Sequence, residues 1–296
     1  MSSGISCGFV VLHYQSLEMT VRCVDTLLEH LGSQPVSIVV VDNGSPNGSG
    51  VRLRERYRVE HKVEVVLTGE NLGFARGNNV GYAWLKEHGD PDFIVVMNND
   101  VLIEQDDFVG LVQRLHARQG FAVLGPDIYE PATGCHRNPY KTEGYSRDEA
   151  QRLLRNMHLW DKFFPYRYGK LRSASRTQKR RDNAPSSEVP WKREAVGCML
   201  QGSCFVFSRE FTSVRSVAFC PDTFLYFEEA ILARDCEKLG LKMLYSPEVR
   251  VTHLGSVSTK HAGGSDYKRE KLKNRQHFQS VQVFVNRYDS MDVCDR

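Results

Sequence analysis

Runs of Val, Ile and Leu alternate with amphipathic helical patterns over the first 130 residues, and this alternation constrains the fold more than any other feature. Buried strands are predicted at residues 7–14, 36–45, 62–69 and 92–100. Amphipathic helices are predicted at residues 17–31 and 74–89. Near-continuous apolar strands separated by helices indicate an α/β fold, in which helices flank a mostly parallel sheet on both faces.

Polar clusters follow three of these strands at the point where each strand ends. They are Asp42 with Asn43, Asn71 with Gly73, and the run Asn98, Asn99 and Asp100. Parallel sheets bind ligands beyond the carboxyl ends of their strands, so we expect the clusters to share one edge. Each cluster alone is typical of a turn or a helix start. Together they predict a nucleotide pocket.

The size of the chain fits a globular body. Its 296 residues, 41% of them apolar, suffice for one large domain or two small ones. No run of about 18 apolar residues occurs, and the first residues lack the charged head and cleavage site of a signal peptide. We therefore expect a cytoplasmic protein.

The eight cysteines are scattered, without a C-x-x-C pair. Cys7, Cys204 and Cys220 have apolar neighbours, which is typical of buried thiols in a large intracellular chain. We expect these thiols to be reduced, and neither a disulfide framework nor a cysteine zinc site.

Positive charge is concentrated in one segment. Residues 137–193 contain 15 Lys or Arg against 6 Asp or Glu, whereas the remainder contains 24 against 30. Such a segment can face the phosphates of nucleic acid, of anionic lipid or of a lipid-linked substrate. It can equally be a solvated loop with no specific role.

Seven stretches carry a resemblance to a known family. They are VVLHYQS, VVVDNGS, NLGFARGNNVGY and VVMNNDV in the first half, then LQGSCFVFSRE, DTFLYFEEAILARDCEKLG and VTHLGSVS. In this order they resemble the family 2 glycosyltransferases, GT-A fold enzymes that transfer a sugar from a nucleotide diphosphate. The motifs are most similar to those of bacterial rhamnosyltransferase-like members that build O-antigens and capsules. The resemblance covers residues 5–130 and 195–290.

The resemblance implies one GT-A domain made of two halves. Residues 1–130 form a nucleotide-sugar-binding half, and residues 196–296 form a half that binds the acceptor and supplies the catalytic base. Residues 131–195 are a basic, aromatic insertion between them. A helix is predicted over residues 146–164 and a mobile loop over 173–190. The aromatic side chains are those of Trp160, Phe163, Phe164, Tyr166 and Tyr168.

Three roles for the insertion remain open. An aromatic and basic element can lie on an anionic membrane surface, which would suit a lipid-diphosphate acceptor. It can also be a helix that packs on the sheet, or a contact between subunits.

The resemblance assigns a donor site. Asp42, next to Asn43, would accept a hydrogen bond from N3–H of uracil or thymine, which selects a pyrimidine. Asn71, Gly73 and Arg76 would lie against the nucleotide sugar, with Gly73 permitting close backbone approach. Arg76 could instead pair with a surface carboxylate.

The resemblance also implies a site for Mg²⁺ or Mn²⁺. The family's Asp-x-Asp motif ends the fourth strand, and here Asn98 occupies the first acidic place. Asp100 is then the sole charged ligand, while the Asn98 and Asn99 amides can bind ribose or sugar hydroxyls. His253 stands where many relatives place a histidine near the metal and diphosphate. A lone histidine after a strand can also be a satisfied polar residue.

The acceptor segment of the family contains an acidic pair that opens a helix. Glu228 and Glu229 match this pair, before a helix predicted over residues 230–239. By resemblance Glu229 is the base and Glu228 orients the acceptor, although relatives usually have Glu-Asp here. The pair could also be an acidic helix cap.

These roles imply inverting transfer from a dTDP- or UDP-linked sugar, such as rhamnose, to a saccharide or lipid-linked acceptor, with contact to the inner face of the membrane. Two other classes of protein would require features that the sequence lacks. A nucleotidyltransferase should have a Gly-rich, Lys-containing loop near the first strand, and LHYQSLEMTVR has none. A nucleic-acid-binding module should show a known motif or a globally basic chain, so we expect no nucleic-acid partner.

Overall fold

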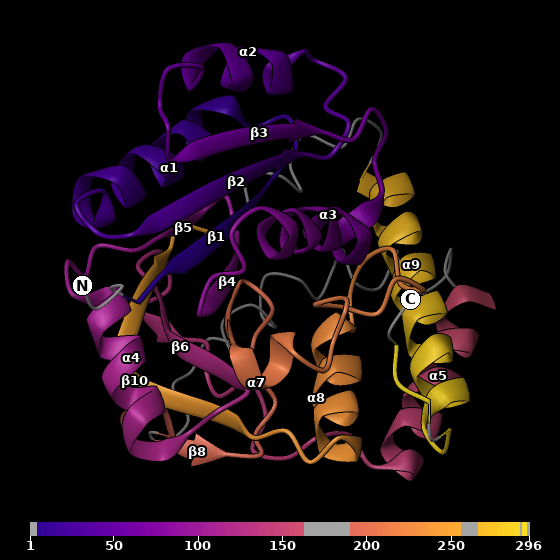
Figure 1. Ribbon diagram of the computed structural model, residues 1–296. Coiled ribbons are helices and arrows are strands. Elements are labelled where there is room, and N and C mark those ends of the chain that lie inside the picture. Colours follow the sequence, from indigo (N-terminus) through magenta and orange to yellow (C-terminus); the bar gives the residue numbers. More distant parts are fainter. Residues whose placement is uncertain (1–4, 163–189, 256–265, 291, 295–296) are drawn as a thin grey trace.

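The structure is a computed structural model that describes residues 5–162, 190–255, 266–290 and 292–294 (Figure 1). Most of the predicted mobile loop, and four of the five aromatic residues of the insertion, lie outside these ranges. Within them the chain forms a ten-stranded sheet with helices on both faces. The predicted α/β, GT-A type of architecture is therefore confirmed.

Four parallel strands form the first half of the sheet. In spatial order they are β3 (Val63–Leu67), β2 (Val36–Asp42), β1 (Cys7–His13) and β4 (Phe93–Asn98). The pairings among these four strands are all parallel, as the near-continuous apolar runs predict. Their carboxyl ends consequently share one edge.

Beyond β4 the sheet is mixed. β9 (Cys204–Ser208) lies antiparallel between β4 and β6 (Val123–Glu130), and β10 (Met243–His253) runs parallel to β6. Three short strands pair antiparallel at the margins: β5 (Val101–Leu102), β7 (Cys135–His136) and β8 (Ala195–Val196). The edge formed by the first four strands therefore continues to the end of β10.

Two apolar cores cover the two faces of the sheet. One contains side chains of α1 (Leu17–Leu31), α2 (Ser49–Arg56) and α4 (Phe108–Gln119). The other contains side chains of α3 (Gly73–His88), α7 (Arg209–Thr212) and α8 (Glu228–Lys238). α1 and α3 match the predicted helices within a residue at each end.

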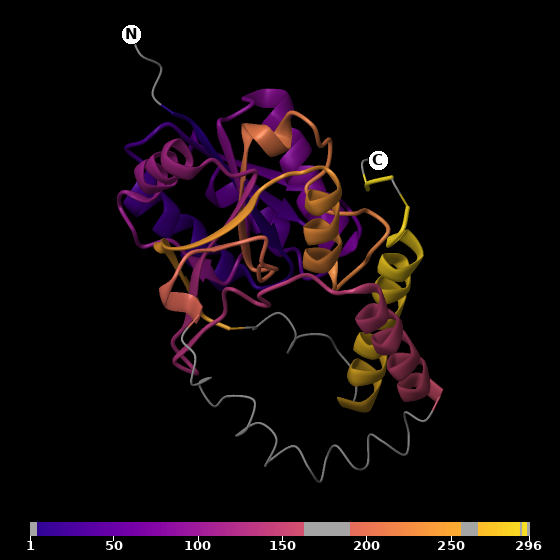
Figure 2. The same ribbon diagram turned by 90° about the horizontal axis from the view of Figure 1, so that it is seen from below.

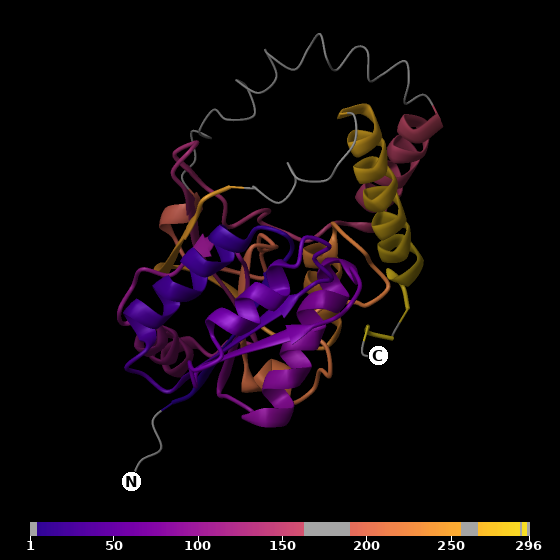
Figure 3. The ribbon, with the colours of Figure 1, turned by 90° about the horizontal axis from the view of Figure 1, so that it is seen from above.

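A third apolar cluster joins α5 (Arg147–Lys162) and α9 (Asp266–Arg287) to α8. The two long helices lie side by side at one end of the molecule in Figures 2 and 3. A short 3-10 helix, η1 (Pro190–Lys192), precedes β8. Among the helices that the structure describes, none combines the length and apolar character of a bilayer span.

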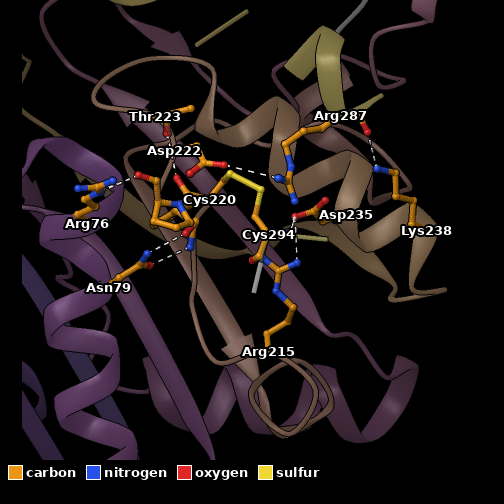
Figure 4. The surroundings of a disulfide bond; sticks show 12 residues. Arg76, Asn79, Arg215, Cys220, Asp222, Thr223, Asp235, Lys238, Arg287 and Cys294 are labelled. Atoms are coloured by element: carbon orange, nitrogen blue, oxygen red, sulfur yellow. Dashed lines mark hydrogen bonds and ion pairs between the residues drawn. A yellow bond between two sulfur atoms is a disulfide. The ribbon is translucent and has the colours of Figure 1, made fainter. Parts of the chain in front are cut away.

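The prediction of reduced thiols is wrong for Cys220, which forms a disulfide with Cys294, 74 residues away (Figure 4). Cys7 and Cys204 are buried free thiols, as predicted, and burial raises the pKa of Cys204 to about 12. Pairing between such distant cysteines depends on where the fold places the C-terminal residues. It is therefore invisible to local sequence patterns.

Candidate active site

Asp42 is the last residue of β2 and is buried at the shared edge of the sheet. The Ser45 backbone N–H lies 3.3 and 3.4 Å from its two carboxylate oxygens. Gly50, in the first turn of α2, lies against the carboxylate, since a Cβ there would be 2.2 Å from Asp42 Oδ2. The first turn of a helix presents unpaired N–H groups, which favour a negative charge. Asp42 therefore lies against the start of α2, at the predicted base-binding position.

A buried histidine next to Asp42 was missed by sequence reasoning. His13 ends β1, and its ring nitrogens lie 2.6 Å from Thr20 Oγ1 and 2.7 Å from Ser49 Oγ. Burial lowers the pKa of His13 to about 4, so the ring is neutral at physiological pH. Asn99 Nδ2 donates to the same Thr20 hydroxyl at 2.8 Å. This network fixes Asn99 beneath the edge, and its role in nucleotide binding stays a prediction.

Asn43 connects β2 to the start of α3. Its Nδ2 donates to Asn71 Oδ1 at 3.2 Å and to the Gly73 carbonyl at 3.0 Å. Its Oδ1 accepts the Leu72 N–H at 2.9 Å. Asn43 and Asn71 therefore meet, as the shared edge predicts, and they hold the backbone of the loop before α3.

Gly73 has φ of 82°, and a Cβ there would lie 2.3 Å from the Phe224 carbonyl oxygen. The next residue, Phe74, donates its N–H to that oxygen at 2.7 Å. Close backbone approach at Gly73 thus occurs, but its partner is the chain segment that precedes α8. We call this segment, residues 213–227, the α8 loop.

Arg76 and Asn79 join α3 to the α8 loop (Figure 4). Arg76 Nε donates to the Pro221 carbonyl at 2.7 Å, so its structural partner is a backbone oxygen in place of the surface carboxylate considered above. Asn79 exchanges two hydrogen bonds with the Phe219 backbone, at 2.8 and 3.0 Å. α3 is thereby tied to the segment that leads into Glu228.

Asp100 and His253 are brought together by β5 and β10, in which Val101 is the register partner of His253. His253 Nε2 lies 3.3 Å from Asp100 Oδ1. Both residues are buried, and neither Asp100 Oδ1 nor His253 Nδ1 has a hydrogen-bond partner within the described residues. Buried polar atoms without partners are costly unless a ligand satisfies them.

A carboxylate and an imidazole are suitable donors for Mn²⁺, and a carboxylate for Mg²⁺. The residues present therefore fit a divalent cation that takes its other ligands from substrate or water. Asn98 is half-buried at the end of β4, two residues before Asp100. It supplies a neutral amide where a second carboxylate would have bound the cation more strongly.

α8 begins at Glu228, two residues earlier than predicted. The preceding Tyr226 and Phe227 have φ of 73° and 70°, a left-handed conformation that costs roughly 1–2 kcal/mol per non-glycine residue. This turn places Glu228 in the interior and leaves Glu229 half-buried. The strained turn therefore gives the two carboxyl groups different surroundings.

Burial, and then the neighbouring Glu229, raise the pKa of Glu228 to about 8. Burial also raises the pKa of Glu229. Burial thus outweighs the helix amino end, which would lower both pKa values. At neutral pH Glu228 is mostly protonated, so Glu229 is the member of the pair better suited to accept a proton.

Two tyrosines that sequence reasoning missed lie within the electrostatic range of Glu229. The charge of Glu229 contributes to a raised pKa at both Tyr140 and Tyr145, after the larger effect of burial. Gly202 lies on another side, since a Cβ there would be 3.7 Å from Glu229 Oε2. The surroundings of Glu229 thus include residues from the insertion and from the loop before β9.

Comparisons with known proteins show which family this chain resembles in sequence. The family model described as "Glycosyl transferase family 2" matches residues 9–177. An N-acetylglucosaminyl-diphospho-decaprenol L-rhamnosyltransferase of Mycobacterium tuberculosis is 28% identical over 234 residues, which cover 76% of this chain and 69% of that protein. The predicted likeness to rhamnosyltransferases is confirmed.

Two solved structures share the fold. GalNAc-T7 with UDP, GalNAc and Mn²⁺ superposes with a TM-score of 0.59 and 12% identity, over 98% of this chain and 49% of that one. A mannosyltransferase of Pyrobaculum calidifontis with GDP-Man and Mn²⁺ superposes with a TM-score of 0.54 and 12% identity, over 94% of this chain and 69% of that one. The chain thus spans about half of GalNAc-T7. Because the family model matches more than half of the sequence, this protein belongs to glycosyl transferase family 2.

Proposed function

We propose that this glycosyltransferase moves a sugar from a uridine or thymidine diphosphate donor to a saccharide or lipid-linked acceptor, with inversion at the anomeric carbon. The observation that carries the proposal is the arrangement at one edge of the sheet. There the buried Asp100 and His253 have unsatisfied polar atoms, and the α8 loop ties the same edge to Glu228 and Glu229.

Asp42 is proposed to recognise the pyrimidine base of the donor. Its carboxylate can accept the N3–H of uracil or thymine, whereas cytosine and adenine present an acceptor at the corresponding ring nitrogen. Asn43, Asn71, Gly73 and Arg76 would shape the adjoining surface for ribose and diphosphate. Asn98 and Asn99 would serve the ribose or donor-sugar hydroxyls.

Asp100 and His253 would hold Mg²⁺ or Mn²⁺. When bound, the cation would neutralise negative charge on the departing diphosphate. The chain's own contribution is to present one carboxylate and one imidazole at a fixed edge of the sheet. Mn²⁺ in both solved structures supports this assignment.

Glu229 would act as the general base. It would take the proton of an acceptor hydroxyl as the hydroxyl oxygen bonds to the anomeric carbon and the bond from that carbon to the diphosphate oxygen breaks. Attack opposite the leaving group inverts the configuration. Glu228, protonated at neutral pH, can donate a hydrogen bond to the acceptor without adding a second negative charge.

The acceptor class follows from the mycobacterial relative, whose name specifies a diphospho-decaprenol and L-rhamnose. We propose a lipid-linked saccharide acceptor, and a place on the cytoplasmic face of the membrane in the synthesis of a cell-surface polysaccharide such as an O-antigen or capsule. L-rhamnose from dTDP-rhamnose is the first donor to test, followed by UDP-glucose, UDP-galactose and UDP-galactofuranose.

Purified protein should be incubated with each radiolabelled nucleotide sugar, Mn²⁺ and a lipid-linked acceptor, with chromatography of the lipid fraction as the readout. Transfer of label from one pyrimidine donor, with release of the nucleoside diphosphate, is expected. Release of pyrophosphate from a nucleoside triphosphate and a sugar phosphate would indicate a nucleotidyltransferase instead. Binding of nucleic acid without turnover would indicate a binding module.

A further inference from the structure

α9 exposes a basic stripe along one side of the helix. Lys268, Lys271, Leu272 and Arg275 are exposed and recur at helical spacing, so they share one side of the helix. Leu272 is 54% exposed. The same stripe continues with exposed Gln279 and Gln282. Its first half therefore carries three cations around one leucine, and no carboxylate.

The opposite side of α9 fixes the direction of this stripe. Val281 and Phe284 are buried, and the Ser280 hydroxyl donates to the Leu225 carbonyl at 3.0 Å. The rings of Phe284 and Phe227 lie 5.3 Å apart. Because the apolar side is held by the α8 loop, the basic stripe cannot turn inward.

α5 repeats the pattern. Arg152, Arg155 and Leu159 are exposed and share one side of the helix, and Leu159 is 47% exposed. The other side of α5, with Ala150 and Met157, is buried in the cluster shared with α9. Both helices of this pair, seen side by side in Figures 2 and 3, thus expose a leucine among basic side chains.

We propose that this surface docks the enzyme on an anionic lipid bilayer. The surface consists of two exposed stripes on neighbouring helices: Arg152, Arg155 and Leu159 on α5, where Asp148 is also exposed, and Lys268, Lys271, Leu272 and Arg275 on α9. Lys and Arg side chains are attracted to anionic headgroups, and a partly exposed leucine gains by entering the interfacial region. Binding to the bilayer does not depend on the proposed function. Its role, to bring the enzyme to a lipid-linked acceptor, rests on the proposed function.

A bilayer suits this surface better than two other partners. Nucleic acid offers phosphates but no apolar layer for Leu159 and Leu272. A second copy of the chain would bring like charges together at the stripe, which is unfavourable. Contact between Phe284 of α9 and Phe227, the residue before Glu228, also links the docked helix to the proposed base.

Cosedimentation of the full chain with vesicles tests the proposal. Binding is expected to phosphatidylcholine vesicles that contain phosphatidylglycerol, to fall as salt is added, and to be weak on phosphatidylcholine alone. The K268Q/K271Q/R275Q variant should bind anionic vesicles about 100-fold more weakly, since each lost cation costs roughly fivefold. The matched control R22Q/R52Q/R58Q removes three exposed cations elsewhere and should bind like the parent.

A second variant tests the contribution of Leu159 and Leu272 to vesicle binding. The L159S/L272S variant should bind anionic vesicles more weakly than the parent while keeping the same dependence on salt. Unchanged binding by the K268Q/K271Q/R275Q variant, or equal loss in the control, would overturn the proposal. Binding of duplex DNA is a further control. If the K268Q/K271Q/R275Q substitutions abolish tight DNA binding but leave vesicle binding intact, the proposal is also overturned.

Failure of this inference is distinguishable from failure of the proposed function. Vesicle binding needs no donor and no turnover. The K268Q/K271Q/R275Q variant should retain hydrolysis of the donor and lose transfer only to an acceptor embedded in vesicles. Absence of transfer with every donor, alongside salt-sensitive vesicle binding, would reject the proposed function and leave the docking surface in place.

Discussion

At the scale of single residues, the unequal burial of Glu228 and Glu229 defines their chemistry. The two side chains leave adjacent positions in the first turn of α8, yet Glu228 is buried and Glu229 is half-buried. Adjacent carboxyl groups with different surroundings can hold different protonation states at one pH. The pair can thereby provide one base and one hydrogen-bond donor.

Glu229→Gln should lower kcat by about 100-fold or more and leave the Kd for the donor nearly unchanged, because it removes the proton acceptor but keeps the shape. Steady-state transfer assays and donor titration check this. Glu228→Gln is the matched control and should act mainly on the KM of the acceptor. An inactive Glu228→Gln beside an active Glu229→Gln would exchange the two roles.

Glu228 also predicts a pH dependence of stability. Its pKa is raised from 4.5 to about 8 in the folded state, so its favourable contribution is complete below pH 4.5 and is lost as the pH rises through 8. The Gln side chain in Glu228→Gln cannot ionise. Raising the pH from 5 to 8 should therefore lower the unfolding free energy of this variant by roughly 2–4 kcal/mol less than it lowers that of the parent. Urea denaturation at the two pH values measures this, and parallel losses would contradict the raised pKa.

Asp100→Asn should remove most Mn²⁺ affinity, since it deletes the charged member of the Asp100 and His253 pair. Asn98→Asp should have the opposite effect and tighten Mn²⁺ binding by adding a second carboxylate to the same edge. Isothermal titration in the presence of the nucleoside diphosphate checks both. A wild-type enzyme with full activity in a strong chelator would show that the cation role is wrong.

At the scale of elements, the contact between the start of α3 and the α8 loop joins the four parallel strands to the segment that leads into Glu228 and Glu229. Gly73→Ala forces a Cβ to within 2.3 Å of the Phe224 carbonyl and places alanine at φ of 82°. Gly69→Ala is the matched control, with φ of 79° and no described atom within 4 Å of its Cβ. The two variants thus share the backbone strain and differ in the steric clash.

Gly69→Ala should cost about 1 kcal/mol of unfolding free energy, and Gly73→Ala at least 1 kcal/mol more. Gly73→Ala should also weaken donor binding, because the α8 loop must move away from α3. Denaturant unfolding and donor titration separate these effects. Equal costs for the two variants would show that the Phe224 contact is unimportant.

At the scale of the whole molecule, the C-terminal residues are held against α8 and its loop (Figure 4). Besides the disulfide, the buried Arg215 donates to Asp235 at 2.9 Å and to the Cys294 carbonyl at 2.5 Å. Cys294 N–H donates to the same Asp235 carboxylate at 3.2 Å. Cys294 therefore anchors the α8 loop, which leads into the helix that carries the proposed base.

Opening the disulfide by Cys220→Ser should lower the unfolding free energy by about 2–4 kcal/mol, as expected for a crosslink that closes a loop of 74 residues. Unfolding of the oxidised parent with and without reductant measures this. The Cys220→Ser variant is the control, and reductant should not change its stability. A parent that is indifferent to reductant would contradict the pairing.

Local patterns in the sequence predicted the four parallel strands and two of the helices within residues 1–130. The strands β1 to β4 and the helices α1 and α3 were predictable because each buries a long, regular apolar face. α2 was missed because only Ser49, Gly50 and Leu53 are buried in it, too few for a clear period. Parallel strands share their carboxyl edge, so the meeting of Asn43 with Asn71 also followed from the sequence.

Periodicity and motifs within short stretches were thus enough to predict the strands β1 to β4, the helices α1 and α3, the family and the types of residue at the edge of the sheet. Three features required the tertiary structure: the approach of Phe224 to Gly73, the pairing of Cys220 with Cys294, and the burial of Glu228 beside a half-buried Glu229. The partners in the first two contacts are far apart in the chain, and the burial of the acidic pair depends on how distant elements pack around α8.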